Sequence, residues 1–296
     1  MSDFVVSAWL NGTWAAEDVV AVAKDVEAAG YDGIWLADHF MANTGTAERS
    51  DTPLFECFGL LAGLATVVPR VRLGSLVASM TYRHPAVLAN TAATIDELSG
   101  GRLVLGMGAG WQLNEHAAYG IELGSVTERI DRLEEGLAVL TGMLRTERTT
   151  VEGTHYTVTD APRVPTSGRR IPIMLGAAGE RRMLGVVARR ADEWNCWSTP
   201  ELFARKSAVL DEHCARIGRD PRTIRRSTQA ILDIDGTPTE SRQPIIAGSV
   251  NQIVDVIGRW REAGLDELIV PGIRSDAADA RVLFERFHAE IRPQLG

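Results

Sequence analysis

A short apolar run, a turn and an amphipathic stretch follow one another along most of the chain. Residues 4–9 (FVVSAW) predict a first strand, and residues 15–29 predict a helix that ends at Gly30. Seven further units each pair a predicted strand with the helix that follows it: 33–38 with 53–68, 72–79 with 85–98, 102–106 with 127–145, 172–175 with 180–191, 193–197 with 201–217, 227–234 with 250–263, and 266–270 with 276–291. Such alternation predicts parallel strands, and eight units in 296 residues favour a closed (β/α)8 TIM barrel.

Two segments interrupt this alternation. Residues 149–165 alternate threonine, valine and tyrosine around Gly153 and predict an inserted β-hairpin. The polar residues 235–248 separate the seventh strand from its helix and form a candidate lid. An open Rossmann-like sheet is the alternative fold, but residues 10–13 (LNGT) lack the glycine fingerprint that it needs after the first strand. We therefore predict one barrel domain over residues 1–296.

The composition argues against several classes of protein. The formal net charge of −8 disfavours binding to the phosphate backbone of nucleic acids. No apolar run reaches about 18 residues, and the first residues lack the basic and apolar regions of a secretory signal. We expect a cytoplasmic protein without a membrane span. The cysteines, Cys57, Cys196 and Cys214, are too widely spaced for a disulfide framework or a zinc site.

The functional residues of a (β/α)8 barrel lie on the loops that follow its strands. Asp38 and His39 follow the second predicted strand, and His39 is a candidate acid or base because histidine titrates near neutral pH. Neighbouring strand residues point to opposite faces, so this pair does not favour a metal site. A hydrolase is disfavoured because no G-x-S-x-G motif is present and Cys196 has no neighbouring cation.

Two glycine-rich loops are candidate anion sites. Residues 176–182 (GAAGERR) open the helix after the fifth strand, where backbone N–H groups and the helix dipole attract a phosphate. The alternative is a tight turn with solvated arginines. Residues 106–110 (GMGAG) follow the fourth strand and give a weaker signal, for which close approach of neighbouring loops is the alternative.

Several segments, in order, resemble the bacterial luciferase-like monooxygenases and, within them, the branch that uses the deazaflavin coenzyme F420. They are residues 30–39 (GYDGIWLADH), 83–85 (RHP), 96–106 (DELSGGRLVLG), 108–111 (GAGW) with Asn114 and Glu115, and 191–195 (ADEWN). The resemblance implies a barrel with insertions, a homodimer, and a flavin or deazaflavin at the mouth of the barrel. It also implies His39 as the catalytic proton donor.

The resemblance further implies a set of cofactor-binding residues. The ring would lie beside Asp38 and His39, backed by a non-prolyl cis peptide near Leu76 and Val77. The rest of the set follows the cofactor's side chain and phosphate: Ser79, Ala109, Gly110, Asn114, Gly179, Glu180, Arg182 and Met183.

Two departures from the F420-dependent sugar-phosphate dehydrogenases bear on the substrate. Trp111 stands where those enzymes have a carboxylate, and residues 198–200 (STP) stand where they have a lysine. With Tyr82 and Trp197, Trp111 predicts an apolar or aromatic substrate. We therefore expect an F420-dependent oxidoreductase. The alternatives are a monooxygenase that uses reduced FMN and oxygen, supplied by a separate reductase, and a non-catalytic flavin-binding subunit.

Overall fold

A computed structural model describes residues 4–166, 168–237, 243–273 and 276–295. The chain divides into two compact units. The first comprises residues 1–35 and 174–296, and the second comprises residues 36–173.

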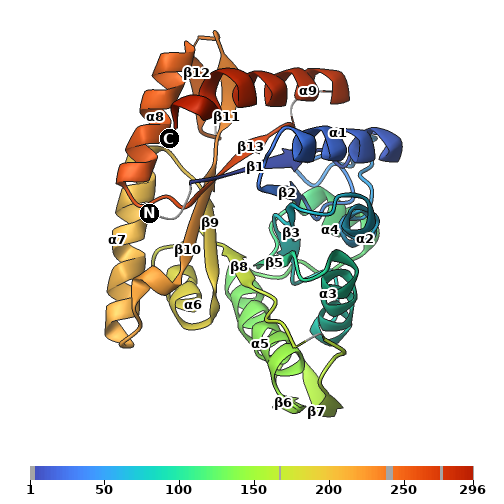
Figure 1. Cartoon of the computed structure of the whole chain (residues 1–296). Helices are drawn as coiled ribbons and strands as arrows, with labels where there is room; N and C mark the ends of the chain where they lie inside the picture. The colour runs from blue at the N-terminus through green and yellow to red at the C-terminus, as the bar shows by residue number, and fades with distance from the viewer. Residues whose placement is uncertain (1–3, 167, 238–242, 274–275, 296) are drawn as a thin grey trace. The chain divides into compact units, whose positions relative to one another are not determined.

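The first unit is built on parallel strands (Figure 1). Hydrogen-bonded neighbours follow the order β2 (Gly33–Leu36), β1 (Val5–Leu10), β13 (Glu267–Pro271), β10 (Arg225–Gln229), β9 (Glu193–Trp197) and β8 (Ile173–Gly176). Every residue of β13 is buried, and β9 is buried up to its last residue. Nearly continuous burial is typical of parallel strands that are covered on both faces, and the apolar runs in the sequence reflect it.

Helices follow the strands of the first unit along the chain: α1 (Ala16–Ala28), α6 (Met183–Arg190), α7 (Pro200–Arg216), α8 (Val250–Glu262) and α9 (Ala277–Arg286). Short helical turns lie at η1 (Pro221–Thr223), η2 (Phe287–Ile291) and η3 (Arg292–Gln294). Ser249 caps α8 by accepting the Gln252 N–H, and the Gln252 side chain accepts the Ser249 N–H in return. Local sequence therefore sets where this helix begins.

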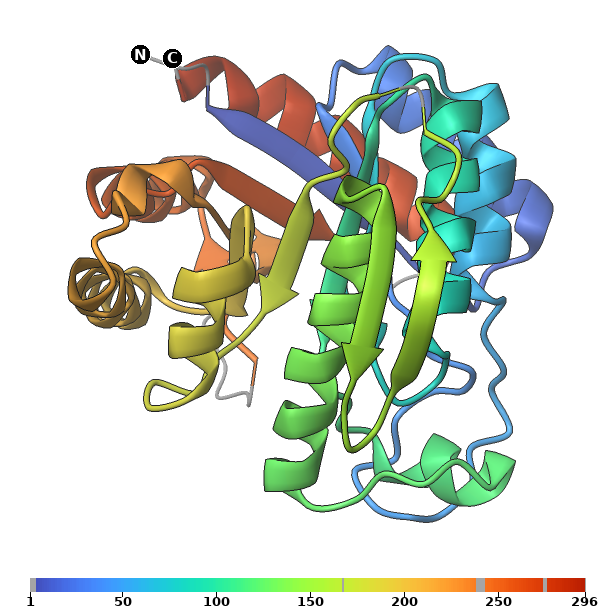
Figure 2. The ribbon, with the colours of Figure 1, turned by 90° about the horizontal axis from the view of Figure 1, so that it is seen from below.

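The second unit holds β3 (Arg72–Ser75), β4 (Ala78–Ser79) and β5 (Leu103–Gly108), and both β3 and β4 pair in parallel with β5. Its helices are α2 (Cys57–Val67), α3 (Pro85–Ser99), α4 (Leu113–Tyr119) and α5 (Val126–Arg145). The antiparallel hairpin of β6 (Arg148–Glu152) and β7 (Thr157–Pro162) runs beside α5 (Figure 2). This hairpin confirms the predicted insertion.

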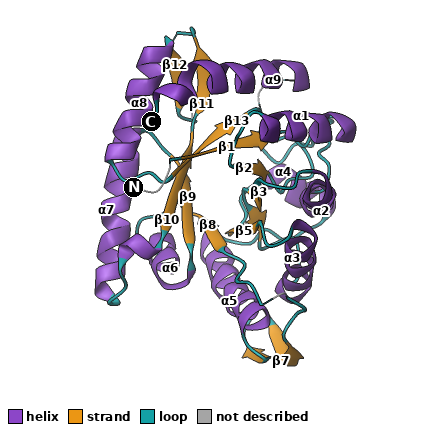
Figure 3. Cartoon of the chain, in the orientation of Figure 1, coloured by secondary structure: helices purple, strands orange, loops and turns teal. Residues whose placement is uncertain are grey.

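The structure corrects several of the predicted elements (Figure 3), and the strand predicted over 72–79 is two strands, β3 and β4, separated by residues 76 and 77. The helix predicted from residue 53 begins at Cys57, because Glu56 caps it and Pro53 pairs with Met41 in an isolated bridge. Helix α4 was not predicted. The strand predicted over 227–234 is two strands, β10 and β11 (Ile231–Ile234), and β11 pairs in parallel with β12 (Ile245–Gly248) in a separate sheet.

Part of the candidate lid is therefore regular structure, since β12 lies within residues 235–248. Residues 238–242 of that segment lie outside the described residues, and a lid function stays a prediction. Among the described residues, no helix combines the length and the hydropathy that a membrane span requires. All three cysteines are buried and free.

Candidate functional site

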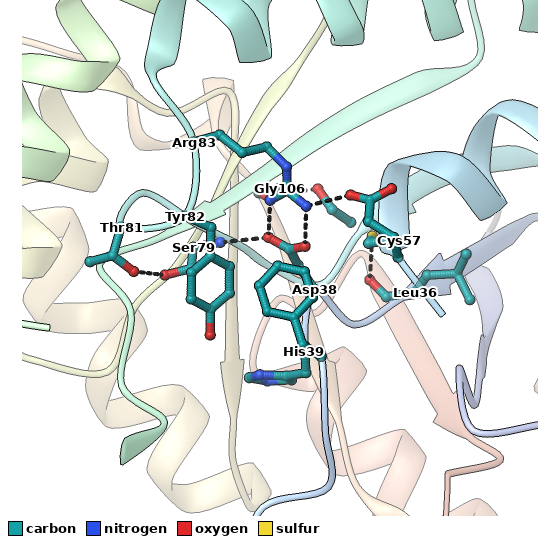
Figure 4. A network of polar contacts seen from close by, with 12 residues as sticks. Leu36, Asp38, His39, Cys57, Ser79, Thr81, Tyr82, Arg83 and Gly106 are labelled. Atoms are coloured by element: carbon teal, nitrogen blue, oxygen red, sulfur yellow. Dashed lines mark hydrogen bonds and ion pairs between the residues drawn. The ribbon is translucent and has the colours of Figure 1, made fainter. Parts of the chain in front are cut away.

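Asp38 is bound from two directions in the second unit (Figure 4). Its carboxylate is fully buried and receives two hydrogen bonds from the Arg83 guanidinium, at 2.7 and 2.9 Å. The Ser79 backbone N–H donates to the same carboxylate at 3.1 Å, and Glu56 forms a second ion pair with Arg83. Burial raises the pKa of Asp38, while Arg83 and the Ser79 N–H act to lower it. Asp38 therefore anchors the end of β4 and the segment before α3.

His39, next in the chain, is held by a different carboxylate. Its Nδ1 lies 2.6 Å from Oε1 of Glu115, whose side chain is fully buried, whereas the His39 side chain is 21% exposed. The Phe40 N–H donates to Glu115 at 2.8 Å, and the Tyr82 hydroxyl donates to it as well. Burial raises the pKa of Glu115, but the bonds from His39, Tyr82 and Phe40 outweigh burial and leave the pKa below its usual value. Glu115 is therefore ionised at neutral pH.

The tautomer of His39 follows from this contact. A carboxylate without a proton only accepts, so the Nδ1 of His39 carries the hydrogen and the Nε2 is left for another partner. The Trp111 ring lies edge-on to the imidazole, with 5.4 Å between centroids and an interplanar angle of 85°. Trp111 is 53% exposed. A partly exposed imidazole backed by a buried carboxylate is suited to moving a proton.

His116, one residue after Glu115, lies in a chain of neutral groups. Its Nδ1 lies 2.6 Å from the Gln112 carbonyl oxygen, and its Nε2 lies 2.7 Å from Oγ1 of Thr81. The Thr81 hydroxyl in turn lies 2.6 Å from Oγ of Ser79. Burial lowers the pKa of His116, so its imidazole is neutral at neutral pH.

Two glycines bring the backbone close to side chains of residues 77–81. Gly110 has φ +87°, and a Cβ there would lie 2.7 Å from the Ser79 Oγ. A Cβ at Gly108 would lie 2.7 Å from Cγ2 of Val77. Both positions therefore favour glycine. The peptide bond from Leu76 to Val77, between β3 and β4, is cis, as the family resemblance implied.

Asn114 leaves one polar atom without a partner. Its amide nitrogen donates to the Ala42 carbonyl at 2.8 Å. Its Oδ1 is buried and accepts no hydrogen bond from any described residue. Buried oxygens are rarely left unpaired in proteins, so this atom is a candidate acceptor for a bound donor.

The other predicted binding loop, residues 176–182, lies in the first unit between β8 and α6. Lys206 of α7 donates to the Ala178 carbonyl at 2.6 Å and pairs with Glu180 at 3.2 Å. Arg205 pairs with Glu180 at 3.3 Å. The hydrogen bond from Lys206 is the largest of the influences that lower the pKa of Glu180. Glu180 is therefore engaged in fixing the loop, and α6 begins at Met183, directly after Arg182.

Two tryptophans meet at the carboxyl ends of strands in the first unit. Trp9 is the second-to-last residue of β1, and Trp197 is the last residue of β9. Their ring centroids are 5.6 Å apart. Strands β13 and β10 lie between β1 and β9 in the sheet, so the two rings come from strands that are not neighbours. Neighbouring Cys196 is buried, and burial raises its thiol pKa to about 12, which disfavours a nucleophilic role.

The structure thus brings Asp38, His39, Ser79, Gly110 and Asn114 of the predicted set into one unit. Sequence reasoning missed roles for further residues: Arg83, Glu115, Thr81, His116 and Lys206. Glu115 and His116 were visible as adjacent titratable residues after the fourth strand, but nothing local identified their partners.

Comparison with known proteins identifies the family. The model for luciferase-like monooxygenases matches residues 2–267, and the chain belongs to that family. It is 33% identical over 200 residues to an F420-dependent glucose-6-phosphate dehydrogenase of Microbacterium testaceum, covering 65% of this chain and 57% of that protein. It is 30% identical over 223 residues to the protein of the same name from Kineococcus radiotolerans, covering 74% of this chain and 64% of that protein. The matches thus span less than two thirds of either relative.

Solved structures share the fold. An F420-dependent secondary alcohol dehydrogenase in complex with an F420-acetone adduct matches with a TM-score of 0.83 over 99% of both chains, at 15% identity. The coenzyme F420-dependent tetrahydromethanopterin reductase from Methanopyrus kandleri matches with a TM-score of 0.82 over the whole of both chains, at 18% identity. The chain has the (β/α)8 barrel fold of its family, as its strand and helix alternation predicted.

Proposed function

We propose that the protein is an oxidoreductase that transfers a hydride between coenzyme F420 and an organic substrate of apolar or aromatic character. The observation that carries this proposal is the His39–Glu115 pair, in which a partly exposed imidazole has its Nδ1 hydrogen fixed on a buried, ionised carboxylate. Membership of the luciferase-like family and the names of the relatives from Microbacterium testaceum and Kineococcus radiotolerans support the choice of cofactor.

Residues of the second unit fit a deazaflavin with a hydroxylated side chain, and the start of α6 in the first unit is a separate candidate phosphate site. In the second unit, the unpaired Asn114 Oδ1 and the Ser79 hydroxyl would hold side-chain hydroxyls, and Leu76, Val77 and His39 would lie at the ring. In the first unit, the backbone N–H groups of Gly179 and Met183 and the side chain of Arg182 would hold a phosphate at the start of α6. When bound, the cofactor supplies the carbon that accepts or gives the hydride.

His39 performs the proton transfer in this proposal. When an alcohol is oxidised, its hydroxyl proton passes to His39 Nε2 while the hydride leaves its carbon; in the reverse direction Nε2 returns the proton. Glu115 holds the imidazole in the required tautomer and stabilises the positive charge that forms on it. Asp38 contributes through Arg83 and Ser79 rather than by contact with substrate.

The substrate class is proposed from Trp111 beside His39 and from the lysines. Lys206 is bound to Ala178 and Glu180, and Lys24 lies exposed on α1. Neither supports binding of a sugar phosphate at the proton-transfer site. Trp111 offers an aromatic edge at His39, which favours a flat or apolar substrate.

A monooxygenase that uses reduced FMN is the second candidate, favoured by the family whose model matches residues 2–267. Titrations of the purified protein with oxidised F420 and with FMN, followed by cofactor fluorescence, distinguish the two. We expect F420 to bind more tightly than FMN. Tighter binding of FMN would favour the monooxygenase, and binding of neither cofactor would contradict both candidates.

The same titration tests the phosphate site with a matched pair of variants. We expect Arg182→Ala to weaken F420 binding by about tenfold, because a charge-assisted hydrogen bond to phosphate is lost. Arg190→Ala, at the far end of the same helix, is the control and should bind as the wild type does. Equal affinities for all three proteins would mean that Arg182 does not bind the phosphate.

The homodimer and the separate reductase stay predictions. Analytical sedimentation can test the first, and reconstitution with a reductase can test the second.

A further inference from the structure

The hydrogen bonds between Ser79, Thr81, His116 and the Gln112 carbonyl, which we call the hydroxyl relay, run in one direction only. A carbonyl oxygen cannot donate, so His116 Nδ1 carries the hydrogen that binds Gln112. In a neutral imidazole the Nε2 is then bare and accepts the Thr81 hydroxyl hydrogen. Because that hydrogen is used, the contact of 2.6 Å between the two hydroxyls requires Ser79 to donate to Thr81.

The relay therefore decides what Ser79 can offer to a ligand. Its only hydroxyl hydrogen points to Thr81, and its oxygen keeps lone pairs that accept. We propose that His116 and Thr81 are positioning residues that hold Ser79 Oγ as a hydrogen-bond acceptor for a donor hydroxyl on the side chain of the bound cofactor. The inference rests on the proposed function and adds to it the polarity of one binding contact and the residues that set it.

Two observations in the same unit support this polarity. Asn114 Oδ1 is also a buried acceptor without a partner among the described residues, while the amide nitrogen of the same side chain donates to the Ala42 carbonyl. Gly110 lies directly against the two hydroxyls, where a Cβ would approach Ser79 Oγ to 2.7 Å and Thr81 Oγ1 to 3.0 Å. Acceptors of this kind, with close backbone approach at Gly110, suit a polyol chain, because each of its hydroxyls can donate.

Protonation of His116 would reverse the relay. With a hydrogen on Nε2, His116 donates to Thr81, and the Ser79 hydrogen is no longer required by Thr81. The hydrogen bond to the Gln112 carbonyl and the charge of Glu115 on the same helix favour this charged form, and Arg129 of α5 and His39 oppose it. The Tyr82 ring packs on the imidazole with 4.9 Å between centroids. Burial lowers the pKa of His116, so the acceptor state dominates at neutral pH and is lost in acid.

The tautomer can be measured without any ligand. Nitrogen NMR of protein labelled with 15N-histidine reports which imidazole nitrogen carries hydrogen. At neutral pH we expect His116 to show a protonated Nδ1 and a bare Nε2. A hydrogen on Nε2 at neutral pH would overturn the relay, whatever cofactor the protein binds.

The effect on a ligand is measured with Thr81→Val, which removes the hydroxyl and keeps the shape. Dissociation constants for oxidised F420 are compared with the wild type from pH 7.5 down through the pH at which the NMR spectra show His116 gaining a proton, and their ratio cancels titration of the ligand itself. We expect wild-type binding to be about fivefold tighter at pH 7.5, since one oriented hydrogen bond is lost in the variant, and this advantage to shrink as His116 gains a proton in acid. Thr94→Val is the matched control, because among the described residues the Thr94 hydroxyl donates to the Asn90 carbonyl of its own helix.

His116→Gln sharpens the result, because glutamine offers a donor and an acceptor but does not titrate in this range. We expect its affinity near neutral pH to approach that of the wild type, without the loss in acid. A Thr81→Val ratio that stays constant while the NMR spectra show His116 gaining a proton would overturn the inference and leave the proposed function intact. If the wild type does not bind F420, both the proposed function and this inference are wrong. The wild-type titration by itself distinguishes that outcome.

Discussion

His39 and His116 lie in the same unit, and each donates its Nδ1 hydrogen to a fixed acceptor at 2.6 Å. The acceptor is the ionised carboxylate of Glu115 for His39 and the neutral carbonyl of Gln112 for His116. A carboxylate stabilises an imidazolium that forms during a reaction, whereas a carbonyl in a buried site does not compensate for the lost hydration. The same hydrogen bond thus prepares His39 to change charge and His116 to stay neutral.

The largest expected effect comes from removing the negative charge of Glu115, which distinguishes the surroundings of His39 from those of His116. Glu115→Gln keeps the shape but cannot stabilise a positive His39. We expect the turnover number to fall by about 1000-fold with little change in the KM for F420, by analogy with the loss of a carboxylate behind a catalytic histidine. The assay follows F420 absorbance with the organic substrate that gives the wild type its highest turnover.

Glu122→Gln is the control for that variant, because Glu122 is exposed and pairs at the surface with Arg132. Its turnover should match the wild type. A turnover number for Glu115→Gln within about fivefold of the wild type, in a protein that remains folded by circular dichroism, would contradict the assignment of His39 and Glu115.

Tyr82 tests how firmly the carboxylate must be held. Tyr82→Phe removes one of three donors to Glu115 and leaves those from His39 and Phe40. Because a hydrogen bond to a charged group contributes about 2 kcal/mol, we expect the free energy of unfolding to fall by about that amount. Turnover should fall by about tenfold, less than in Glu115→Gln.

Tyr119→Phe is the matched control for Tyr82→Phe. Tyr119 lies 54% exposed at the end of α4 and packs its ring on Phe40. Urea unfolding should give it the stability of the wild type. If the two tyrosine variants lose equal stability, the Tyr82 hydroxyl is not a specific partner of Glu115.

The comparison also shows what the sequence could and could not predict. The strands were predictable because buried parallel strands are nearly continuous apolar runs, as in β9 and β13. Helix α4 was missed because it is short and its buried residues, Asn114, Glu115 and His116, are polar. A helix that buries polar residues gives no amphipathic signal.

Part of the candidate site was also predictable, and part was not. His39 could be proposed from its place after a strand, but its partner Glu115 lies 76 residues further along the chain. Lys206 reads as an ordinary helical residue, and its contacts with residues 178 and 180 depend on how α7 packs in the first unit. Tertiary contacts decide which histidine lies against an ionised carboxylate. The sequence around His39 and His116 does not predict this.

The smallest expected effect is on acid stability, and its sign separates Glu115 from an ordinary surface glutamate. The pKa of Glu115 in the folded protein lies below its usual value of about 4.3. Its ionised form therefore contributes stability in full above that usual value, and the contribution is lost as the pH falls through the folded pKa. We expect the difference in unfolding free energy between the wild type and Glu115→Gln to shrink as the pH is lowered from 6 toward 3, measured by urea denaturation. The corresponding difference for Glu122→Gln should stay near zero throughout. A difference for Glu115→Gln that grows in acid would mean that the buried carboxylate is protonated in the folded protein, and the contrast between the two histidines would then fail, because both would face neutral acceptors.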